Sequence, residues 1–274
     1  MTDAVFLEKL ENIKCFALDL DGTLYLGNTL FPYSKFFLEK VRESQRDFLF
    51  LPNNSLLSPL DYLQRLQKLG IAVEEEQIYT SADSTLEYLL NFGPGHRLCI
   101  MGSDSLIRFF EASGFVNEPD EPDALVLGTD YDFDYSRLQH ATQLLKQGVP
   151  FYATHIDPTI PVEHGRCLPD CGAIAAALTA ATGVSPTVLG KPSLHMLEGL
   201  LRRTGLGRSE FAIIGDRLDS DVLMGKEHGV LSILVLAGET SKQMLRDSTI
   251  KPDFVVQSLL SLVRYLDRKQ LQVV

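Results

Sequence analysis

Short apolar runs alternate with stretches of helical spacing along most of the chain. An apolar run without polar alternation is typical of a parallel strand that is buried on both faces. On this basis we predict strands at 15–19, 47–51, 78–80, 97–101, 124–128, 150–154, 187–189, 211–215, 231–236 and 253–256. Helical spacing and capping signals predict helices at 5–12, 32–44, 58–69, 105–113, 136–146 and 171–182.

Turn and capping residues define three of the helix boundaries. Ser58 precedes Pro59, and Gly70 follows the apolar repeat. This is the usual order of N-cap, first helical residue and C-terminal glycine. Either Ser81 or Asp83 is expected to cap the helix that comes next.

Strands that alternate with helices predict an α/β fold built on a doubly wound parallel sheet. The glycine- and proline-rich stretch at 91–95 marks a connector, and a second series of strands and helices follows it. We therefore interpret residues 84–185 as an inserted α/β domain. Residues 1–83 and 186–274 are expected to form the main domain.

Composition narrows the choice of partners. The chain has 274 residues, a net charge of −11 and ordinary contents of apolar (45%) and charged (22%) residues, as in soluble globular proteins. The acidic balance argues against a nucleic-acid partner. The start is acidic and amphipathic, so we do not expect it to be a signal peptide, and the longest low-charge run, at 172–184, is too short to span a bilayer. We expect a cytoplasmic protein without a membrane partner.

The cysteines do not indicate a metal site. Cys15 and Cys99 lie in apolar runs, where a free thiol packs as a small hydrophobe. Cys167 and Cys171 are spaced as a Cys-x3-Cys pair with His164 nearby, but no second pair completes a zinc site. We do not expect zinc there.

The candidate chemistry begins where the first predicted strand ends. Asp19 and Asp21 follow the apolar run, and Gly22 supplies the turn. In open α/β sheets, ligands bind beyond the carboxyl ends of the strands. Two charges at the edge of a core are costly unless a cation or hydrogen bonds compensate them. Mg²⁺ is suited to this, because it prefers carboxylate oxygen and keeps positions open for water and phosphate.

The stretch Asp19-Leu-Asp-Gly-Thr23 resembles the first motif of the haloacid dehalogenase superfamily. Alone it also fits a turn or a calcium-loop fragment, so the rest of the chain has to decide. The insertion at 84–185 is similar to the cap of the class IIA branch, which includes NagD-like and 4-nitrophenyl phosphatase-like sugar or nucleotide phosphatases. The resemblance covers residues 15 to about 257 and implies a Rossmann-like core with an α/β cap.

Two further motifs support the resemblance. Gly190-Lys-Pro-Ser193 resembles the third motif, whose lysine neutralises the nucleophile and the phosphoryl oxygens. Gly215-Asp-Arg-Leu-Asp-Ser-Asp221 resembles the fourth, with Asp216 as a metal ligand and Asp221 as support. The resemblance therefore implies three catalytic residues, Asp19, Asp21 and Lys191. It also implies Mg²⁺ held by Asp19, the Asp21 carbonyl and Asp216.

The second motif departs from the family pattern. Relatives place a serine or threonine hydroxyl before Asn-Asn, whereas this chain has Pro52, which offers neither a hydroxyl nor an N–H. A missing oxyanion donor costs about 2.7–4 kcal/mol, or 10²–10³ in rate. Asn53 is expected to donate to phosphate, and Ser55 is the candidate for a replacement hydroxyl. The expected phosphate-binding and supporting residues are Gly22, Thr23, Asn53, Asn54, Ser55 and Asp221.

Substrate choice is assigned to the cap. Residues 153–157 resemble the cap turn of class IIA enzymes, and 169–174 resemble their specificity loop. The expected substrate residues are Thr154, His155, Asp157, Asp170, Cys171 and Gly172. For Asp170 a plain helix N-cap is an equal alternative, and His155 also fits a structural histidine.

The resemblance implies a Mg²⁺-dependent phosphatase that hydrolyses a small phosphorylated metabolite, such as a sugar phosphate or a nucleotide, through an aspartyl phosphate. Two alternatives stay open. Pro52 favours a catalytically weak protein that binds or senses a phosphorylated ligand. A phosphotransferase or mutase would also pass through an aspartyl phosphate. A homodimer through the cap is expected from class IIA relatives.

Overall fold

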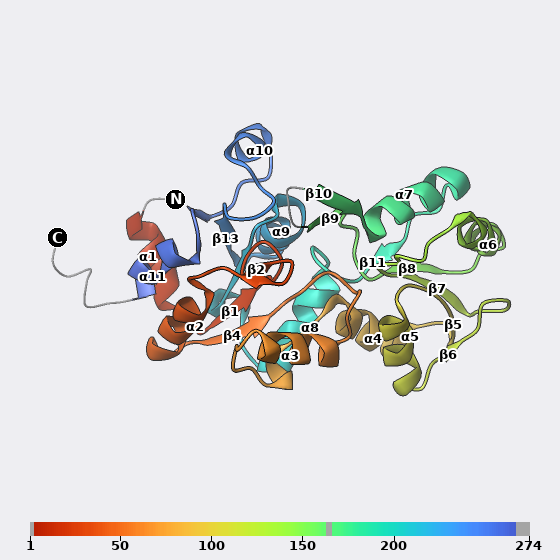
Figure 1. Cartoon of the computed structure of the whole chain (residues 1–274), viewed down its shortest axis with the longest axis horizontal. Helices are drawn as coiled ribbons and strands as arrows, with labels where there is room; N and C mark the ends of the chain where they lie inside the picture. The colour runs from red at the N-terminus through yellow and green to blue at the C-terminus, as the bar shows by residue number, and fades with distance from the viewer. Residues whose placement is uncertain (1–2, 163–165, 267–274) are drawn as a thin grey trace.

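The computed structural model describes residues 3–162 and 166–266 and has two lobes, each built on its own parallel sheet (Figure 1). The first sheet has the order β14-β13-β12-β1-β4. Its strands are β1 (Cys15–Leu18), β4 (Asp47–Phe50), β12 (Phe211–Gly215), β13 (Leu231–Val235) and β14 (Phe254–Val256). Leu18 pairs with both Ile214 and Phe50, so β1, β12 and β4 end at the same edge of the sheet.

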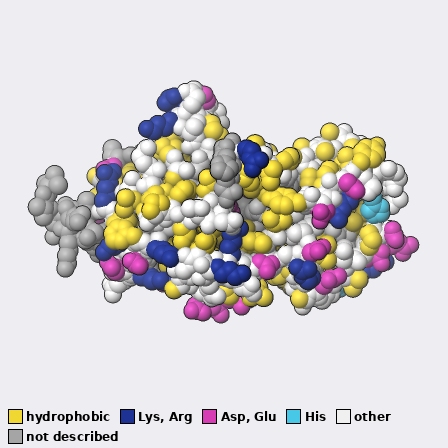
Figure 2. Space-filling view, viewed as in Figure 1, with side chains coloured by type: hydrophobic (Ala, Val, Ile, Leu, Met, Phe, Trp, Pro, Cys, Tyr) yellow, Lys and Arg dark blue, Asp and Glu magenta, His cyan; other side chains and the backbone are white. Residues whose placement is uncertain are grey.

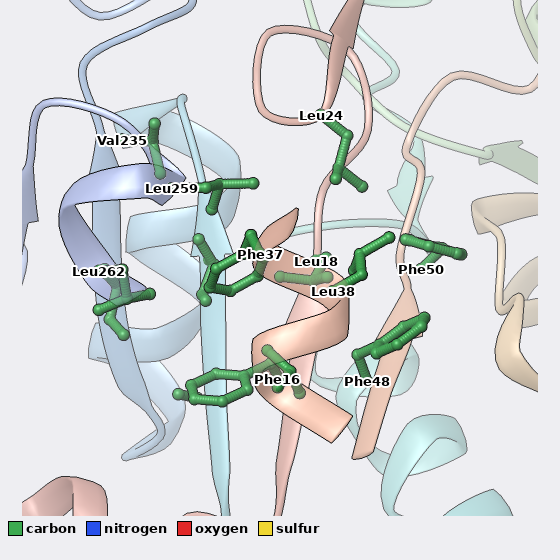
Figure 3. Close-up of a cluster of buried hydrophobic side chains, with 14 of the residues drawn as sticks. Phe16, Leu18, Leu24, Phe37, Leu38, Phe48, Phe50, Val235, Leu259 and Leu262 are labelled. Carbon is green, nitrogen blue, oxygen red and sulfur yellow. The ribbon is translucent and has the colours of Figure 1, made fainter. Parts of the chain in front are cut away.

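Helices cover both faces of this sheet because its strands are apolar on both sides. Phe16 and Leu18 pack on one face against α2 (Ser34–Glu43) and α11 (Leu259–Leu266) (Figure 3). On the same side, α1 (Asp3–Glu11) stacks Phe6 on Phe254. Cys15 and Ala17 point to the other face, which α8 (Leu194–Thr204) and α9 (Leu223–His228) cover.

The second sheet has the order β11-β8-β7-β5-β6, with parallel neighbours throughout. Its strands are β5 (Arg97–Met101), β6 (Val116–Asn117), β7 (Ala124–Leu127), β8 (Phe151–Ala153) and β11 (Thr187–Val188). The helices α4 (Ser81–Phe92) and α5 (Asp104–Ala112) pack on one face, and α6 (Tyr135–Lys146) and α7 (Cys171–Thr182) pack on the other. The predicted α/β fold, a doubly wound core with an inserted α/β cap, is confirmed.

The remaining elements connect or roof these layers. Two short hairpins, which the apolar pattern did not predict, pair β2 (Tyr25–Leu26) with β3 (Thr29–Leu30) and β9 (Thr159–Val162) with β10 (Arg166–Pro169). The other helical segments are α3 (Pro59–Lys68), α10 (Lys242–Asp247), the 3₁₀ turns at Glu75–Gln77 and Arg208–Glu210, and the π-helical turn at Leu218–Val222.

Three local predictions need correction. Residues 78–80 form a single bridge from Ile78 to Phe50 and not a strand. The N-cap of α4 is Thr80, whose hydroxyl accepts a hydrogen bond from Asp83 N. The Asp83 carboxylate in turn accepts from Thr80 N, which completes a capping box. The strand expected in the first sheet at 187–189 pairs with β8 in the cap sheet, because the α7 crossover returns the chain beside β8. The proposed domain boundaries stay a prediction.

Other signals were accurate. Ser58 caps α3 through a hydrogen bond from Asp61 N, with Pro59 as the first helical residue. Gly70 follows α3 in the left-handed region, at φ +76°.

Acidic and basic side chains are scattered over both lobes on the face shown in Figure 2. In the described part of the chain, no helix is both long and apolar enough to cross a membrane. His164 lies outside the described residues.

Candidate active site

Three aspartates meet at the carboxyl edge of the first sheet. Asp19 follows β1, Asp216 follows β12, and Asp221 lies in the π-helical turn after it. Each carboxylate places one oxygen within 4.8 Å of the other two, and all three residues are buried. Among residues 3–162 and 166–266, no other group of three or more acidic, histidine or cysteine side chains is compact enough to hold an ion.

Lys191 is the positive member of this cluster. Its Nζ donates to Asp19 Oδ1 at 2.6 Å and to Asp221 Oδ1 at 2.7 Å, and its side chain is 1% exposed. Burial alone would lower the pKa of Lys191, but the Asp19 and Asp221 carboxylates outweigh it and raise this pKa. The ammonium therefore stays charged. One ammonium therefore lies in a cluster of three carboxyl groups.

Asp216 has an open coordination position. Its Oδ2 accepts from Glu239 N at 2.6 Å, whereas its Oδ1 is buried without a hydrogen-bond partner among the described residues. Burial raises the pKa of Asp216, and the charges of Asp19 and Asp221 add to this. A buried carboxylate oxygen without a partner is costly unless a cation compensates it. These oxygens fit a hard divalent cation such as Mg²⁺.

Two glycines make room for Asp216. A Cβ on Gly22 would lie 2.2 Å from Asp216 Oδ2, and one on Gly238 would lie 2.0 Å from it. Gly22 also has φ +82°, a left-handed conformation that disfavours other residues. Gly22 therefore leaves the space that the Asp216 carboxylate occupies. Thr23 beside it is fully buried, and its Oγ1 has no hydrogen-bond partner in the described chain.

Asp19 and Asp21 differ in their electrostatic surroundings. Burial raises the pKa of Asp19 to about 7, against the opposing effect of Lys191. Burial raises the pKa of Asp21 to about 6, although the positive charge of Arg65 acts to lower this pKa. Asp21 can therefore hold a proton at mildly acidic pH, whereas a divalent cation beside Asp19 would favour its carboxylate form. The Asp21 carboxylate lies outside the compact group of three, so a metal contact through its carbonyl stays a prediction.

A pocket opens over these carboxylates between the core and the cap. The core lines it with Asp19, Asp21, Pro52, Asn53, Asn54, Asp216 and Arg217, and the cap with Asp157, Thr159, Ile160, Pro161 and Asp170. The β9–β10 hairpin thus contributes the roof. Among the predicted cap residues, Asp157 and Asp170 line the pocket, whereas Thr154, His155, Cys171 and Gly172 do not.

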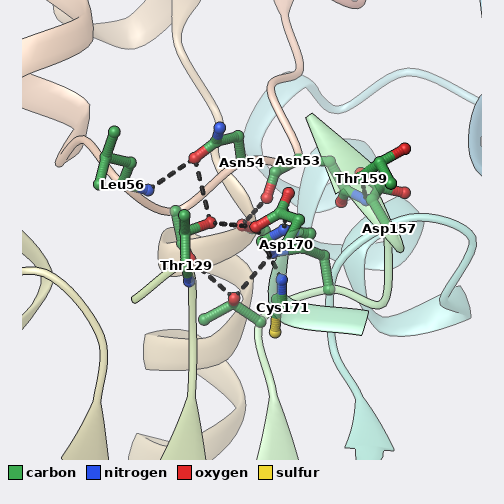
Figure 4. Close-up of polar contacts among 12 residues, drawn as sticks. Asn53, Asn54, Leu56, Thr129, Asp157, Thr159, Asp170 and Cys171 are labelled. Atoms are coloured by element: carbon green, nitrogen blue, oxygen red, sulfur yellow. Dashed lines mark hydrogen bonds and ion pairs between the residues drawn. The ribbon is translucent and has the colours of Figure 1, made fainter. Parts of the chain in front are cut away.

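The cap side of the pocket rests on a closed hydrogen-bond network (Figure 4). Asp170 Oδ2 lies 3.0 Å from His155 Nε2, and Asp170 Oδ1 accepts from Thr129 Oγ1 and Cys171 N. Thr154 Oγ1 lies 3.0 Å from His155 Nδ1. Burial alone would raise the pKa of Asp170, but His155 holds it below its usual value. Asp170 therefore lines the pocket and also caps α7.

Comparison with known proteins agrees with this geometry. A model of haloacid dehalogenase-like hydrolases matches residues 16–116, and a HAD-hydrolase-like model matches 188–262. An acid sugar phosphatase of Staphylococcus saprophyticus is 30% identical over 260 residues, which cover 94% of this chain and 100% of the relative. The chain belongs to the haloacid dehalogenase-like hydrolases. Within that family it is an enzyme of the phosphatase type.

Solved structures give the same result for this hydrolase. The 4-nitrophenylphosphatase of Thermotoga maritima superimposes with a TM-score of 0.89 at 38% identity, covering 94% of this chain and 99% of that one. A glycerol phosphate phosphatase of Mycobacterium tuberculosis in complex with magnesium gives a TM-score of 0.83 at 29% identity, covering 95% of this chain and 78% of that one.

In this hydrolase the Asn53 and Ser55 side chains of the second motif bond within the protein. Asn53 Nδ2 donates to Asp157 Oδ2 at 2.9 Å and to the Lys191 carbonyl at 3.3 Å, and Asn53 Oδ1 accepts from Lys191 N at 2.8 Å. Both amide hydrogens are therefore engaged within the protein. We correct the expectation that the Asn53 side chain donates to phosphate; it braces the Lys191 loop and the cap.

Ser55 also faces the cap. Its Oγ accepts from Thr129 N at 3.0 Å and from Thr154 Oγ1 at 2.9 Å, and the residue does not line the pocket. We therefore correct the expectation that Ser55 supplies a replacement hydroxyl. Asn54 does line the pocket, while its Oδ1 accepts from Leu56 N and Thr129 Oγ1.

Arg217 is a pocket residue that the sequence did not single out. Its Nη1 donates to the Thr159 carbonyl at 3.2 Å, and its Nε lies 3.7 Å from Asp157 Oδ1. In the sequence it is an arginine in an aspartate-rich turn, which usually indicates a solvated side chain. The one feature of the sequence that could have identified Arg217 as a pocket residue is its position directly after Asp216.

Proposed function

We propose that this hydrolase is a Mg²⁺-dependent phosphatase of small phosphorylated metabolites, with sugar and polyol phosphates first and nucleotides second. One observation carries the proposal: Lys191 bridges Asp19 and Asp221 beside the unpartnered buried oxygen of Asp216. This arrangement suits a phosphoryl group that approaches Asp19 with a cation beside it. The names of the relatives, an acid sugar phosphatase and a glycerol phosphate phosphatase, support the substrate class.

The first step transfers the phosphoryl group to the protein. An oxygen of the Asp19 carboxylate attacks phosphorus, and the bond between phosphorus and the ester oxygen breaks. Asp21, whose pKa burial raises to about 6, can carry a proton at mildly acidic pH and gives it to the leaving oxygen. The products are the free alcohol and an aspartyl phosphate on Asp19.

The second step returns the protein to its starting state. The Asp21 carboxylate takes a proton from water, and the hydroxide oxygen bonds to phosphorus as the bond to Asp19 breaks. Inorganic phosphate leaves, and Asp21 is again protonated. Lys191 holds Asp19 in place and offsets charge on the phosphoryl oxygens throughout.

The carboxylates of Asp19 and Asp216, with the Asp21 carbonyl, would hold Mg²⁺, and Asp221 would support them through Lys191. When bound, the cation would neutralise negative charge on the phosphoryl oxygens. The orphaned Asp216 oxygen supports this assignment.

The test is phosphate release from glucose 6-phosphate, glycerol 3-phosphate, a nucleoside 5′-monophosphate and 4-nitrophenyl phosphate, with Mg²⁺ or with EDTA. We expect turnover with Mg²⁺ that disappears with EDTA and in Asp19→Asn. No release from any ester, together with retained ligand binding, would favour the binding or sensing protein that Pro52 suggested. Phosphate that moves to a second sugar position without release to water would favour a mutase.

A further inference from the structure

Asp157 belongs to the cap, yet its carboxylate is bound by the core. Asp157 Oδ2 accepts from Asn53 Nδ2 at 2.9 Å, and Asp157 Oδ1 lies 3.7 Å from Arg217 Nε. The side chains of Asp157 and Arg217 are each only 12% exposed. Figure 4 shows Asp157 and Asn53 on facing segments of the two domains. Both carboxylate oxygens are therefore engaged by core residues.

Asn53 passes this contact on to the loop that carries Lys191. Its carboxamide accepts from Lys191 N and donates to the Lys191 carbonyl, so it holds this residue's backbone at two points. The loop is also confined by the cap. A Cβ on Gly190 would lie 2.2 Å from the Thr154 carbonyl oxygen and 2.6 Å from Asn53 Oδ1. The backbone of Lys191 is thus fixed where core and cap meet.

Arg217 gives a second route from the cap to the same lysine. Its guanidinium donates to the Thr159 carbonyl of the cap hairpin, and its backbone N donates to Asp221 Oδ2 at 3.2 Å. The other oxygen of Asp221 accepts from Lys191 Nζ. The core contacts of the cap therefore converge on both ends of Lys191: its backbone through Asn53 and its ammonium through Asp221.

We propose that Asp157 is a positioning residue whose carboxylate docks the cap on Asn53 and Arg217 and thereby fixes Lys191 between Asp19 and Asp221. The catalytic lysine is then in place only when the cap is seated. This differs from the expectation that Asp157 contacts substrate. The kinetic part of the proposal rests on the phosphatase function proposed above.

The test compares Asp157→Ala and Asp157→Asn with the control Asp134→Asn. Asp134 is an exposed N-cap of α6, so its substitution changes the charge of the cap without touching the pocket. We expect Asp157→Ala to lower kcat by about 10- to 100-fold, the scale of a small misplacement of a reacting group. The loss should be equal for glycerol 3-phosphate and 4-nitrophenyl phosphate, with little change in KM. Asp157→Asn, which keeps an acceptor for Asn53, should lose less.

A second readout does not depend on turnover. Acetic anhydride acetylates accessible amines, and mass spectrometry then reports the extent at Lys191. We expect protection in the wild type and in Asp134→Asn, and a several-fold rise in Asp157→Ala. If Asp157→Ala does not fold, Asp157→Asn and Arg217→Ala are subjected to the same two measurements.

Two results would overturn the inference. One is unchanged acetylation of Lys191 in the Asp157 variants. The other is a loss of activity confined to glycerol 3-phosphate, which would make Asp157 a contact for the leaving group. A wild type that releases no phosphate from either ester would instead refute the proposed function, and the acetylation result would still decide the role of Asp157.

Discussion

The molecule contains two buried polar clusters, one in the core and one in the cap, and they differ in how completely their atoms are paired. In the core, Asp19 and Asp221 share the Lys191 ammonium, whereas Asp216 has no contact with it and its Oδ1 has no partner in the described chain. In the cap, both nitrogens of His155 and both oxygens of Asp170 lie within hydrogen-bond distance of neighbours. Burial is similar in the two clusters, so burial does not distinguish them. Incomplete pairing in a buried site indicates a position for a ligand, whereas complete pairing indicates a structural role.

The largest effect should come from the incompletely paired cluster. Asp19→Asn removes the nucleophile, and we expect phosphate release to fall by about 10⁴-fold or more. Asp219→Asn is the matched control, because Asp219 lies in the same turn as Asp221 with a side chain that is 59% exposed. Initial rates with Mg²⁺ measure both variants. A rate in Asp19→Asn close to that of the control would mean that the incompletely paired cluster is not the catalytic site.

The completely paired cluster should affect stability. Asp170→Ala leaves His155 buried without its partner, and we expect a loss of about 3–5 kcal/mol in the free energy of unfolding. Asp134→Ala, which removes an exposed N-cap from α6, should cost only about 1 kcal/mol. Urea denaturation followed by circular dichroism measures both. Equal costs would mean that the buried His155–Asp170 contact adds nothing to a plain helix cap.

A smaller effect should follow from adding to the core the hydroxyl donor for the phosphoryl group that Pro52 cannot supply. Pro52 lines the pocket, Asn53 is engaged elsewhere and Ser55 faces the cap. Pro52→Thr restores a hydroxyl, and we expect kcat to rise by as much as about 10²-fold, within the range of one oxyanion donor. Steady-state kinetics on glycerol 3-phosphate test this. An unchanged kcat would mean that backbone groups already fill the role.

The smallest effect is a dependence of cap stability on pH. Burial alone would lower the pKa of His155, but Asp170 outweighs it and raises this pKa. The stabilisation from the pair is therefore complete below the ordinary histidine pKa of about 6.5 and is lost as pH rises through the raised value. The difference in free energy of unfolding between the wild type and Asp170→Asn should shrink from pH 6 to pH 9. A difference that is constant or grows over this range would contradict the assignment.

The sequence allowed the acidic cluster to be predicted because each member follows a strand or lies in a short motif. Asp19 and Asp216 come directly after β1 and β12, whose register brings their ends together. The role of Asn53 could not be predicted in the same way. Its partners, Asp157 and Lys191, are 104 and 138 residues away, and the contact depends on how the cap sits on the core.

Local reasoning also failed where one backbone turn decides the direction of a side chain. Ser55 is three residues from Pro52, so proximity suggested that it could replace a missing hydroxyl. The turn instead directs Ser55 to Thr129 and Thr154. The 187–189 run was assigned to the wrong sheet for a related reason: a short apolar run predicts a strand but does not identify its neighbour.

The order of the core sheet has a consequence for the synthesis of the chain. β1 lies between β4 and β12, and Cys15 pairs with Phe211. One edge of β1 therefore stays unpaired until β12, almost two hundred residues later in the chain, has left the ribosome. All five strands of the cap sheet, from β5 to β11, are made in the meantime. Folding during translation can thus complete the inserted lobe first, while the strand that leads to the nucleophile still lacks one neighbour.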